Sequence, residues 1–237
     1  MSSIIYYDES PQSKYVRVLV YGEFGSGKTT FASTFPAPIF LDFDRGGRTL
    51  RDKHIPAIYF KDGRGFFQSV YKALIAMRDK EFDTDFDTVV FDSFSAMAEK
   101  ILDEVMVTLP SGEKDQRTRN PLNEKPTWDN YSALLGRLVA LNNITRDIDA
   151  NIVSICGEKI DRDAETERLM GRPDIDGSYR KRIGRDYDEV YHLVQEGTGP
   201  TPRFMLYSGS HQYFAGKTRE KMDYKIQDPS YSAIFGK

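Results

Sequence analysis

The chain has 237 residues, of which 39% are hydrophobic, 13% aromatic and 29% charged, a composition typical of a soluble domain with a sizeable core. A single cysteine, Cys156, excludes an intramolecular disulfide framework and is expected to be a small buried side chain. No apolar run approaches the ~20 residues that span a bilayer, and residues 1–7 lack the features of a signal peptide, so we expect a cytoplasmic protein with no membrane partner. The formal net charge of −3 gives no overall attraction to nucleic acid, so DNA binding would require a local basic patch.

The N-terminus reads as a short apolar tip on a polar tether. Residues 8–14 are polar and contain a proline, which separates the apolar residues 4–7 from the rest of the chain. The tip either caps its own fold or docks on a neighbouring subunit. We therefore expect an N-terminal segment over residues 1–14, with a possible role in oligomerisation, and a single core over residues 15–237.

A buried strand predicted over residues 16–21 leads into a complete G-x-x-x-x-G-K-[ST] phosphate loop. The predicted nucleotide-binding residues are Gly22, Glu23, Phe24, Gly25, Ser26, Gly27, Lys28, Thr29 and Thr30. In this motif the glycines let backbone N–H groups face the phosphates, Lys28 reaches the β and γ oxygens, and the Thr29 hydroxyl ligates Mg²⁺. A helix predicted over residues 29–35 directs the positive end of its dipole at the same site. The sequence thus predicts a nucleoside triphosphate site.

Strands and helices alternate after this loop, which favours a doubly wound α/β fold with a mostly parallel sheet. Helices are predicted over 65–80 and 128–144, after Ser93, and after a cap at Asp228. Strands are predicted over 38–43, 57–60, 87–92, 151–156, 190–194 and 203–207, the last two joined by a glycine-proline turn and so antiparallel. Residues 108–127 and 158–186 match no element, and loops this long are usually functional or disordered.

Two acids complete the predicted phosphate site. Asp92 ends an apolar strand, as in a Walker B element, and is predicted to hold Mg²⁺ opposite Thr29. Hydrolysis also needs a carboxylate that positions water, and Ser93 occupies the next position. Asp44 is the candidate base, because it shares a face with Asp42 and lies nearer the carboxyl end of its strand, where open α/β sheets bind ligands. The alternative is that Asp44 is a solvated turn acid.

The order of these elements resembles the core of RecA-type recombinases. The segment at residues 40–44 resembles the RecA segment whose last acid is the catalytic glutamate, here an aspartate one methylene shorter. More closely, residues 15–220 resemble the short phage AAA-family nucleotide-binding proteins, core-only RecA relatives that include single-strand annealing recombinases. The segments that carry this likeness are 21–32, 40–44, 92–93, 173–177 and 187–190. The resemblance implies a RecA-like P-loop NTPase core, with helices on both faces of the sheet and an antiparallel C-terminal hairpin, that uses ATP and Mg²⁺.

The resemblance also implies a contribution from a neighbouring subunit. Lys217 and Arg219 resemble the K-x-R pair that RecA-like and DnaB-like ATPases insert into a neighbour's site, where it stabilises the transferring phosphate oxygens. Without the family context both are ordinary surface charges. The chain departs from RecA after its fifth strand, where Glu158 or Lys159 would have to replace the usual γ-phosphate sensor.

The two DNA-binding loops of RecA correspond to the two unassigned stretches. The first carries Lys114, Arg117, Arg119 and Lys125. In the second, the candidate DNA-binding residues are Lys159, Arg162, Arg180, Lys181, Arg182 and Arg185, with Tyr179 as a base-stacking candidate. Four acids crowd the first half of that stretch, so a solvated charged loop is the alternative.

The sequence therefore predicts an Mg²⁺-dependent, DNA-stimulated ATPase that acts on single-stranded DNA in phage recombination, by annealing or strand exchange, in the host cytoplasm. Its expected partners are single-stranded DNA, further copies of itself in a ring or filament, and a single-strand binding protein. Two alternatives stay open. One is a nucleotide-binding DNA scaffold or helicase accessory with weak hydrolysis, and the other is a small-molecule P-loop kinase that uses Asp44 and Arg45 to bind its acceptor.

Overall fold

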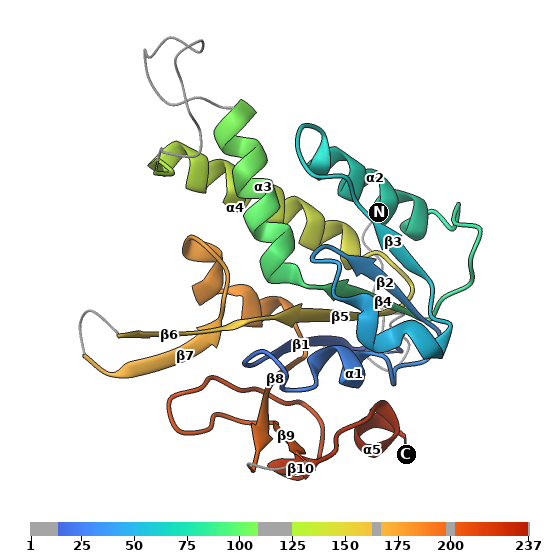
Figure 1. The fold of residues 1–237 in the computed structure, drawn as a ribbon, viewed down its shortest axis with the longest axis vertical. Helices are drawn as coiled ribbons and strands as arrows, with labels where there is room; N and C mark the ends of the chain where they lie inside the picture. The colour runs from blue at the N-terminus through green and yellow to red at the C-terminus, as the bar shows by residue number, and fades with distance from the viewer. Residues whose placement is uncertain (1–13, 109–124, 163–166, 198–201, 237) are drawn as a thin grey trace, which may run out of the picture.

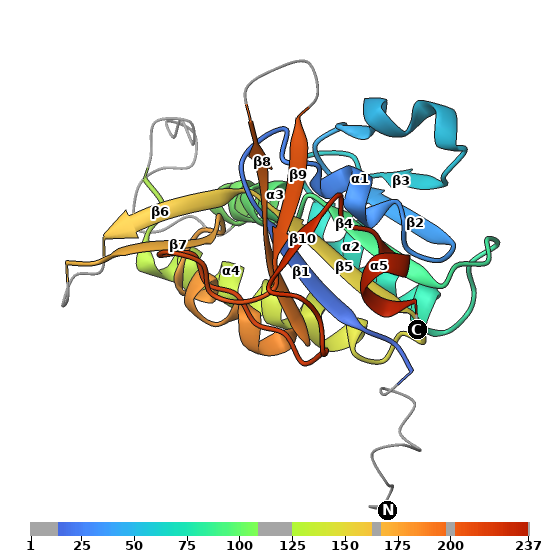
Figure 2. The ribbon, with the colours of Figure 1, turned by 90° about the horizontal axis from the view of Figure 1, so that it is seen from below.

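The computed structural model describes residues 14–108, 125–162, 167–197 and 202–236. Its centre is a twisted eight-stranded sheet of order β10-β9-β8-β1-β5-β4-β2-β3 (Figures 1 and 2). The strands are β1 (Arg17–Tyr21), β2 (Pro38–Asp42), β3 (Ala57–Tyr59), β4 (Thr88–Asp92), β5 (Asn151–Cys156), β8 (Glu189–Glu196), β9 (Arg203–Tyr207) and β10 (Lys225–Gln227). All neighbours from β3 to β8 pair in parallel, whereas β8–β9 and β9–β10 are antiparallel.

Helices cover both faces of this sheet (Figure 1). One face packs against α2 (Phe66–Arg78), α3 (Phe94–Thr108) and α4 (Trp128–Thr145), and the other against α1 (Lys28–Ala32) and α5 (Tyr231–Phe235). Alternation along β1 explains the two layers, since Leu19 and Tyr21 enter the first core while Val18 and Val20 enter the second. A strand that is buried on both faces has a continuous run of apolar residues, and such runs allow these strands to be predicted from the sequence.

The predicted fold class is confirmed. The phosphate loop leaves β1 and the strand that ends in Asp92 is β4, with β5 between them, as in a RecA-like P-loop core. The hairpin of β8 and β9 is antiparallel, as the turn between them indicated. In the described part of the chain, no helix has the length and apolar character needed to cross a membrane.

Three local predictions were wrong. Helix α1 ends at Ala32, and only turn hydrogen bonds continue to Phe35. The final helix is capped by Ser230, whose hydroxyl accepts from Ala233 N at 3.2 Å, and not by Asp228. The stretch 158–186 is not a bare loop: it contains an antiparallel ribbon of β6 (Glu158–Arg162) and β7 (Leu169–Pro173), then the 3-10 turns η4 (Ser178–Lys181) and η5 (Ile183–Asp186). The predictions for residues 1–13 and 109–124 lie outside the described residues.

A buried carboxylate ties three helices together beside the sheet. Glu104 of α3 accepts hydrogen bonds from the backbone N–H groups of Gly65 (2.6 Å) and Phe67 (3.0 Å) at the start of α2. It also pairs with Arg137 of α4 at 3.0 Å. Gly65 offers no side-chain cap, so Glu104 supplies the acceptor that the first turn of α2 lacks.

We expect Glu104→Ala to lower the free energy of unfolding by about 3 kcal/mol, because it leaves two backbone donors of α2 and the partly buried guanidinium of Arg137 without their acceptor. Urea unfolding would measure this. Glu99→Ala on the exposed side of the same helix is the matched control, with an expected change within ~0.5 kcal/mol. Equal urea midpoints for the two variants would contradict the role of Glu104.

Candidate nucleotide site

The phosphate loop joins β1 to α1 along a path that only glycine tolerates at its key positions. Gly25 and Gly27 have left-handed φ angles of 78° and 89°. A Cβ added at Gly27 would lie 3.0 Å from the ring of Phe204, and one added at Gly22 would lie 2.0 Å from the carbonyl oxygen of Leu193. The glycines therefore fix the backbone path, with β8 and β9 packed closely behind it.

Lys28 provides the positive charge of the site. Its ammonium donates to the carbonyl oxygens of Gly22 (2.9 Å) and Glu23 (2.7 Å), inside the curl of the loop. Burial lowers the pKa of Lys28, while the carboxylates of Asp92 and Asp44 act in the opposite direction. Because α1 has only five residues, the attraction for phosphate comes from this ammonium and the loop N–H groups more than from a helix dipole, which corrects our expectation.

Thr29 and Asp92 form the pair of oxygen donors that the motif predicted. The Thr29 hydroxyl donates to Asp92 Oδ2 at 2.9 Å. Asp92 is buried at the end of β4, and burial, with a further contribution from the charge of Asp44, raises its pKa to about 6. The peptide bond between Asp92 and Ser93 is cis. A buried carboxylate next to a hydroxyl and other acids fits a hard cation such as Mg²⁺, which prefers oxygen ligands.

Asp42 and Asp44 have different environments. Asp42 is buried, lies in register with Asp92, and accepts a hydrogen bond from Arg45 N at 2.6 Å. Strand β2 ends at Asp42, so Asp44 lies in the following turn, where it is exposed and accepts from Gly46 N at 2.9 Å. The charge of Asp44 acts on both Lys28 and Asp92. Asp44 therefore lies at the solvent side of the site, where a water molecule can approach.

An ammonium, a hydroxyl and several carboxylates thus converge at the carboxyl ends of β1, β2 and β4. A family model described as an AAA domain matches residues 14–220. The chain belongs to this AAA-domain family. Together with the phosphate loop on its parallel sheet, this places the chain among the P-loop NTPases.

No protein with curated annotation matches the chain significantly. Among solved structures, the AAA-domain protein is similar to a KaiC-like protein from the hyperthermophilic archaeon Pyrococcus horikoshii OT3, at 15% identity and a TM-score of 0.47, with 90% of this chain and 83% of that chain covered. It is also similar to the RadB recombinase, at 15% identity and a TM-score of 0.42, with 81% and 79% covered. Both are likenesses of overall fold.

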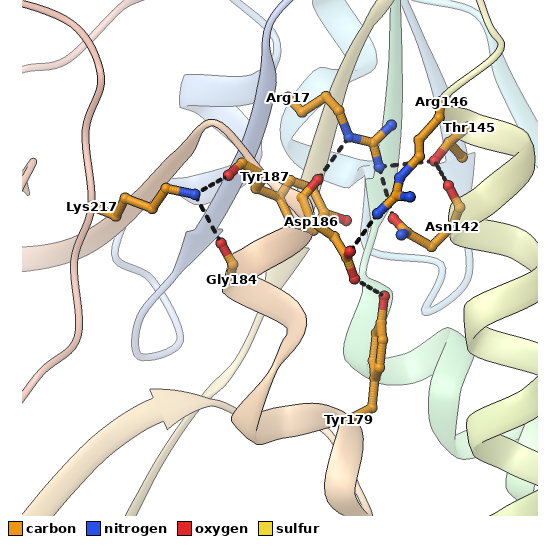
Figure 3. A network of polar contacts seen from close by, with 9 residues as sticks. All are labelled: Arg17, Asn142, Thr145, Arg146, Tyr179, Gly184, Asp186, Tyr187 and Lys217. Atoms are coloured by element: carbon orange, nitrogen blue, oxygen red, sulfur yellow. Dashed lines mark hydrogen bonds and ion pairs between the residues drawn. The ribbon is translucent and has the colours of Figure 1, made fainter.

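The two predicted finger residues of the AAA-domain protein have partners within their own chain. The Lys217 ammonium donates to the carbonyl oxygens of Gly184 (3.3 Å) and Tyr187 (2.5 Å), as Figure 3 shows. Arg219 donates to Asp188 at 2.7 Å, although 65% of its side chain stays exposed. Arg219 is thus the more accessible of the two cations.

Both cations lie at the edge of the sheet opposite the phosphate loop of the same chain. Lys217 bridges to Val190 near the start of β8, where Glu189 pairs with Val18. The phosphate loop begins after Tyr21, at the other end of β1. Neither cation therefore reaches its own phosphates, and a role in a neighbour's site remains a prediction.

The six predicted DNA-binding residues of the AAA-domain protein are not equally available. Arg180 pairs with Asp161 at 3.0 Å, and Lys159 lies 3.9 Å from Asp174. The other four, which are exposed, are Arg162, Lys181, Arg182 and Arg185. Their role in binding DNA remains a prediction.

Tyr179 cannot stack on a base as predicted. Its side chain is buried, and its hydroxyl donates to Asp186 at 3.0 Å, where Arg146 also binds (Figure 3). The ring packs near Phe94 at the root of α3, with 6.3 Å between centroids. Its aromatic surface is therefore used in the core.

Sequence reasoning missed a buried pair below the phosphate loop. His192 of β8 lies in register with Tyr21, and its Nε2 is 2.9 Å from a carboxylate oxygen of Glu158, the first residue of β6. The imidazole ring stacks on Phe214 at 3.8 Å between centroids. No local motif signals this pair, because the two residues come together only when β8 and β5 both pair with β1.

We expect this histidine to make stability depend on pH. Burial lowers the pKa of His192 to about 4, and its Nδ1 has no hydrogen-bond partner among the described residues, so the neutral ring is favoured despite Glu158. In the unfolded chain the ring titrates near the ordinary histidine pKa of 6.5. The contribution of His192 to the free energy of unfolding should therefore fall by roughly 3 kcal/mol as pH decreases from 6.5 to 4, whereas Asp92, whose pKa is raised, contributes in the opposite direction.

Urea unfolding across this pH range would test the prediction. The free energy of unfolding of the wild type relative to His192→Gln should fall by this amount as pH decreases, whereas that relative to His54→Gln, at an exposed position, should not. The prediction is wrong if both variants follow the wild-type pH profile.

Proposed function

We propose that this AAA-domain protein is an Mg²⁺-dependent ATPase that is stimulated by single-stranded DNA and acts in strand annealing or exchange. The observation that supports this most is the convergence of Lys28, Thr29, Asp92 and Asp44, from three separate parts of the chain, at one edge of the sheet. Binding alone requires the loop and its lysine. Hydrolysis additionally requires a carboxylate that faces solvent next to these groups, and Asp44 provides it.

Each residue would have a distinct task. The loop N–H groups and Lys28 bind the β and γ phosphates, and Thr29 and Asp92 would hold Mg²⁺, which neutralises phosphate charge. Asp44 orients the attacking water and accepts its proton. Arg219 of a neighbouring copy, with Lys217, would neutralise the charge that develops on the γ-phosphate.

This arrangement requires self-association in a head-to-tail manner. Because the fingers and the phosphate loop lie at opposite edges of one sheet, a copy can serve its neighbour only through a heterologous contact, which forms rings or filaments. We further propose that residues 15–237 act as one core, that residues 1–14 support this contact, and that the setting is phage recombination alongside a single-strand binding protein. The likeness of the motifs to phage annealing recombinases supports the last point.

An ATPase titration with single- and double-stranded DNA, at two salt concentrations, tests the proposal. We expect turnover to rise with single-stranded DNA, and the DNA concentration needed for half-stimulation to increase with salt, because phosphate contacts release counterions. Turnover that is unaffected by DNA would contradict it.

A nucleotide-binding DNA scaffold with weak hydrolysis is the second candidate. It is favoured by the shorter reach of Asp44 compared with the glutamate of RecA. A single-turnover assay with DNA distinguishes the two, since the scaffold would bind ATP and DNA but leave the γ-phosphate intact over many minutes.

A further inference from the structure

A short 3-10 helix beside the nucleotide site carries a row of cations. Helix η2 (Gly47–Lys53) follows the turn after β2. A 3-10 helix has three residues per turn, so residues three apart lie above one another, about 6 Å apart along the axis. Arg48, Arg51 and the capping His54 have this spacing and all are exposed, while Leu50 is buried and anchors the helix. We call Arg48, Arg51 and His54 the basic row.

The basic row lies in a basic part of an acidic protein. Residues 45–64 contain six lysines and arginines and two aspartates, whereas the whole chain has a net charge of −3. One of those aspartates, Asp62, is already paired with Lys100. Within the described residues, Arg48 and Arg51 make no ion pair. The guanidinium groups are therefore free to bind an anion from solution.

An exposed aromatic ring stands next to the row. Tyr59 lies at the end of the edge strand β3 and is 64% exposed. It is close to the start of η2, because a Cβ added at Gly47 would lie 3.8 Å from the Tyr59 hydroxyl. The combination of arginines that bind phosphates and a ring that stacks on a base is the chemistry of single-strand recognition.

The row is also connected to the nucleotide site. The turn between β2 and η2 carries Asp44, and Asp42 holds it by accepting from Arg45 N. A Cβ added at Gly47 would lie 3.3 Å from the other carboxylate oxygen of Asp42. A ligand on the row would therefore bind next to the segment that places Asp44.

We propose that the basic row and Tyr59 bind single-stranded nucleic acid, with Arg48 and Arg51 on backbone phosphates and Tyr59 stacked on a base. This inference rests on the proposed function for its partner, but it assigns that partner to a surface separate from the β6–β7 ribbon. After the ribbon, η4 lacks an available ring for stacking, because Tyr179 is buried, and its Arg180 is paired with Asp161.

Fluorescence anisotropy with a labelled oligothymidylate, at several salt concentrations, tests the assignment. For the double variant Arg48→Gln/Arg51→Gln we expect weaker binding and a log–log salt slope smaller by about 1.4, since each phosphate contact on a single strand contributes about 0.7. Tyr59→Leu should weaken binding about tenfold without changing the slope. The matched control is Arg78→Gln/Lys80→Gln, which removes two positive charges at the end of α2 and should bind as the wild type does. Urea midpoints confirm that each variant is folded.

The outcomes separate this inference from the proposed function. If Arg48→Gln/Arg51→Gln binds like the wild type while Lys159→Gln/Arg162→Gln does not, the basic row is the wrong surface and the DNA-dependent function stands. If the wild-type protein fails to bind the oligonucleotide even at low salt, both are wrong. Loss of self-association with unchanged DNA affinity would show that the row contacts another copy of the chain, and would also overturn the inference.

Discussion

Asp44→Asn is expected to lower kcat for ATP hydrolysis by about 10²- to 10⁴-fold, because the amide can neither accept a proton nor orient water as a carboxylate does. Nucleotide affinity should stay within about twofold, since Asp44 is exposed at the mouth of the site and is not part of the phosphate loop. Steady-state ATPase assays and binding of a fluorescent ATP analogue would measure the two quantities separately.

Two further variants sharpen this prediction. Asp44→Glu restores the charge and the longer side chain that RecA relatives carry, so we expect it to retain turnover. Asp52→Asn makes the same chemical change on η2, outside the nucleotide site, and should leave kcat unchanged. If Asp44→Asn and Asp52→Asn had equal turnover, the base would have to be sought elsewhere.

Lys28→Ala is expected to lower kcat/KM by about 10³-fold, because it removes the charge that faces the phosphates. The loss should include nucleotide affinity, since the ammonium also holds the carbonyl oxygens of Gly22 and Glu23 within the loop. This distinguishes it from Asp44→Asn, whose effect should be confined to kcat. Lys72→Ala, on the exposed face of α2, is the matched control.

Retention of ATP binding and turnover by Lys28→Ala would contradict the assignment of the phosphate loop. Thermal unfolding with and without nucleotide gives an independent readout, because a ligand raises the unfolding temperature only of a variant whose folded state binds that ligand. The wild type and Lys72→Ala should gain stability from ATP, and Lys28→Ala should not.

The parts of the fold that could be predicted are those that local chemistry determines. The strands of the central sheet are apolar on both faces, and glycines and Pro36 mark the connections between them. These two signals were enough to predict the alternation of strands and helices, and from it the α/β class. The residues predicted around the phosphate, Lys28, Thr29 and Asp92, come together because the ends of parallel strands share one edge.

The parts that could not be predicted depend on contacts between distant segments. Strand β6 is mostly charged, β7 contains a glycine and a proline, and neither has a run of β-branched side chains, so only their pairing with each other identifies them. An isolated tyrosine in a basic run gives no sign of burial, and Tyr179 is buried because Asp186 and Phe94 surround it. The basic row was invisible for a similar reason, since a spacing of three residues has meaning only once η2 is known to be a 3-10 helix.

The most direct test of the account is an ATPase assay on a mixture of two inactive variants. Lys28→Ala lacks a working phosphate loop and Arg219→Ala lacks the finger, but a contact between an Arg219→Ala subunit and a Lys28→Ala neighbour can contain both intact parts. If the site is completed by a neighbouring copy, an equal mixture with freely exchanging subunits should recover about a quarter of wild-type turnover, the fraction of heterologous contacts with both parts intact. A mixture no more active than the sum of its components, or an Arg219→Ala variant with full activity alone, would contradict a site shared between subunits.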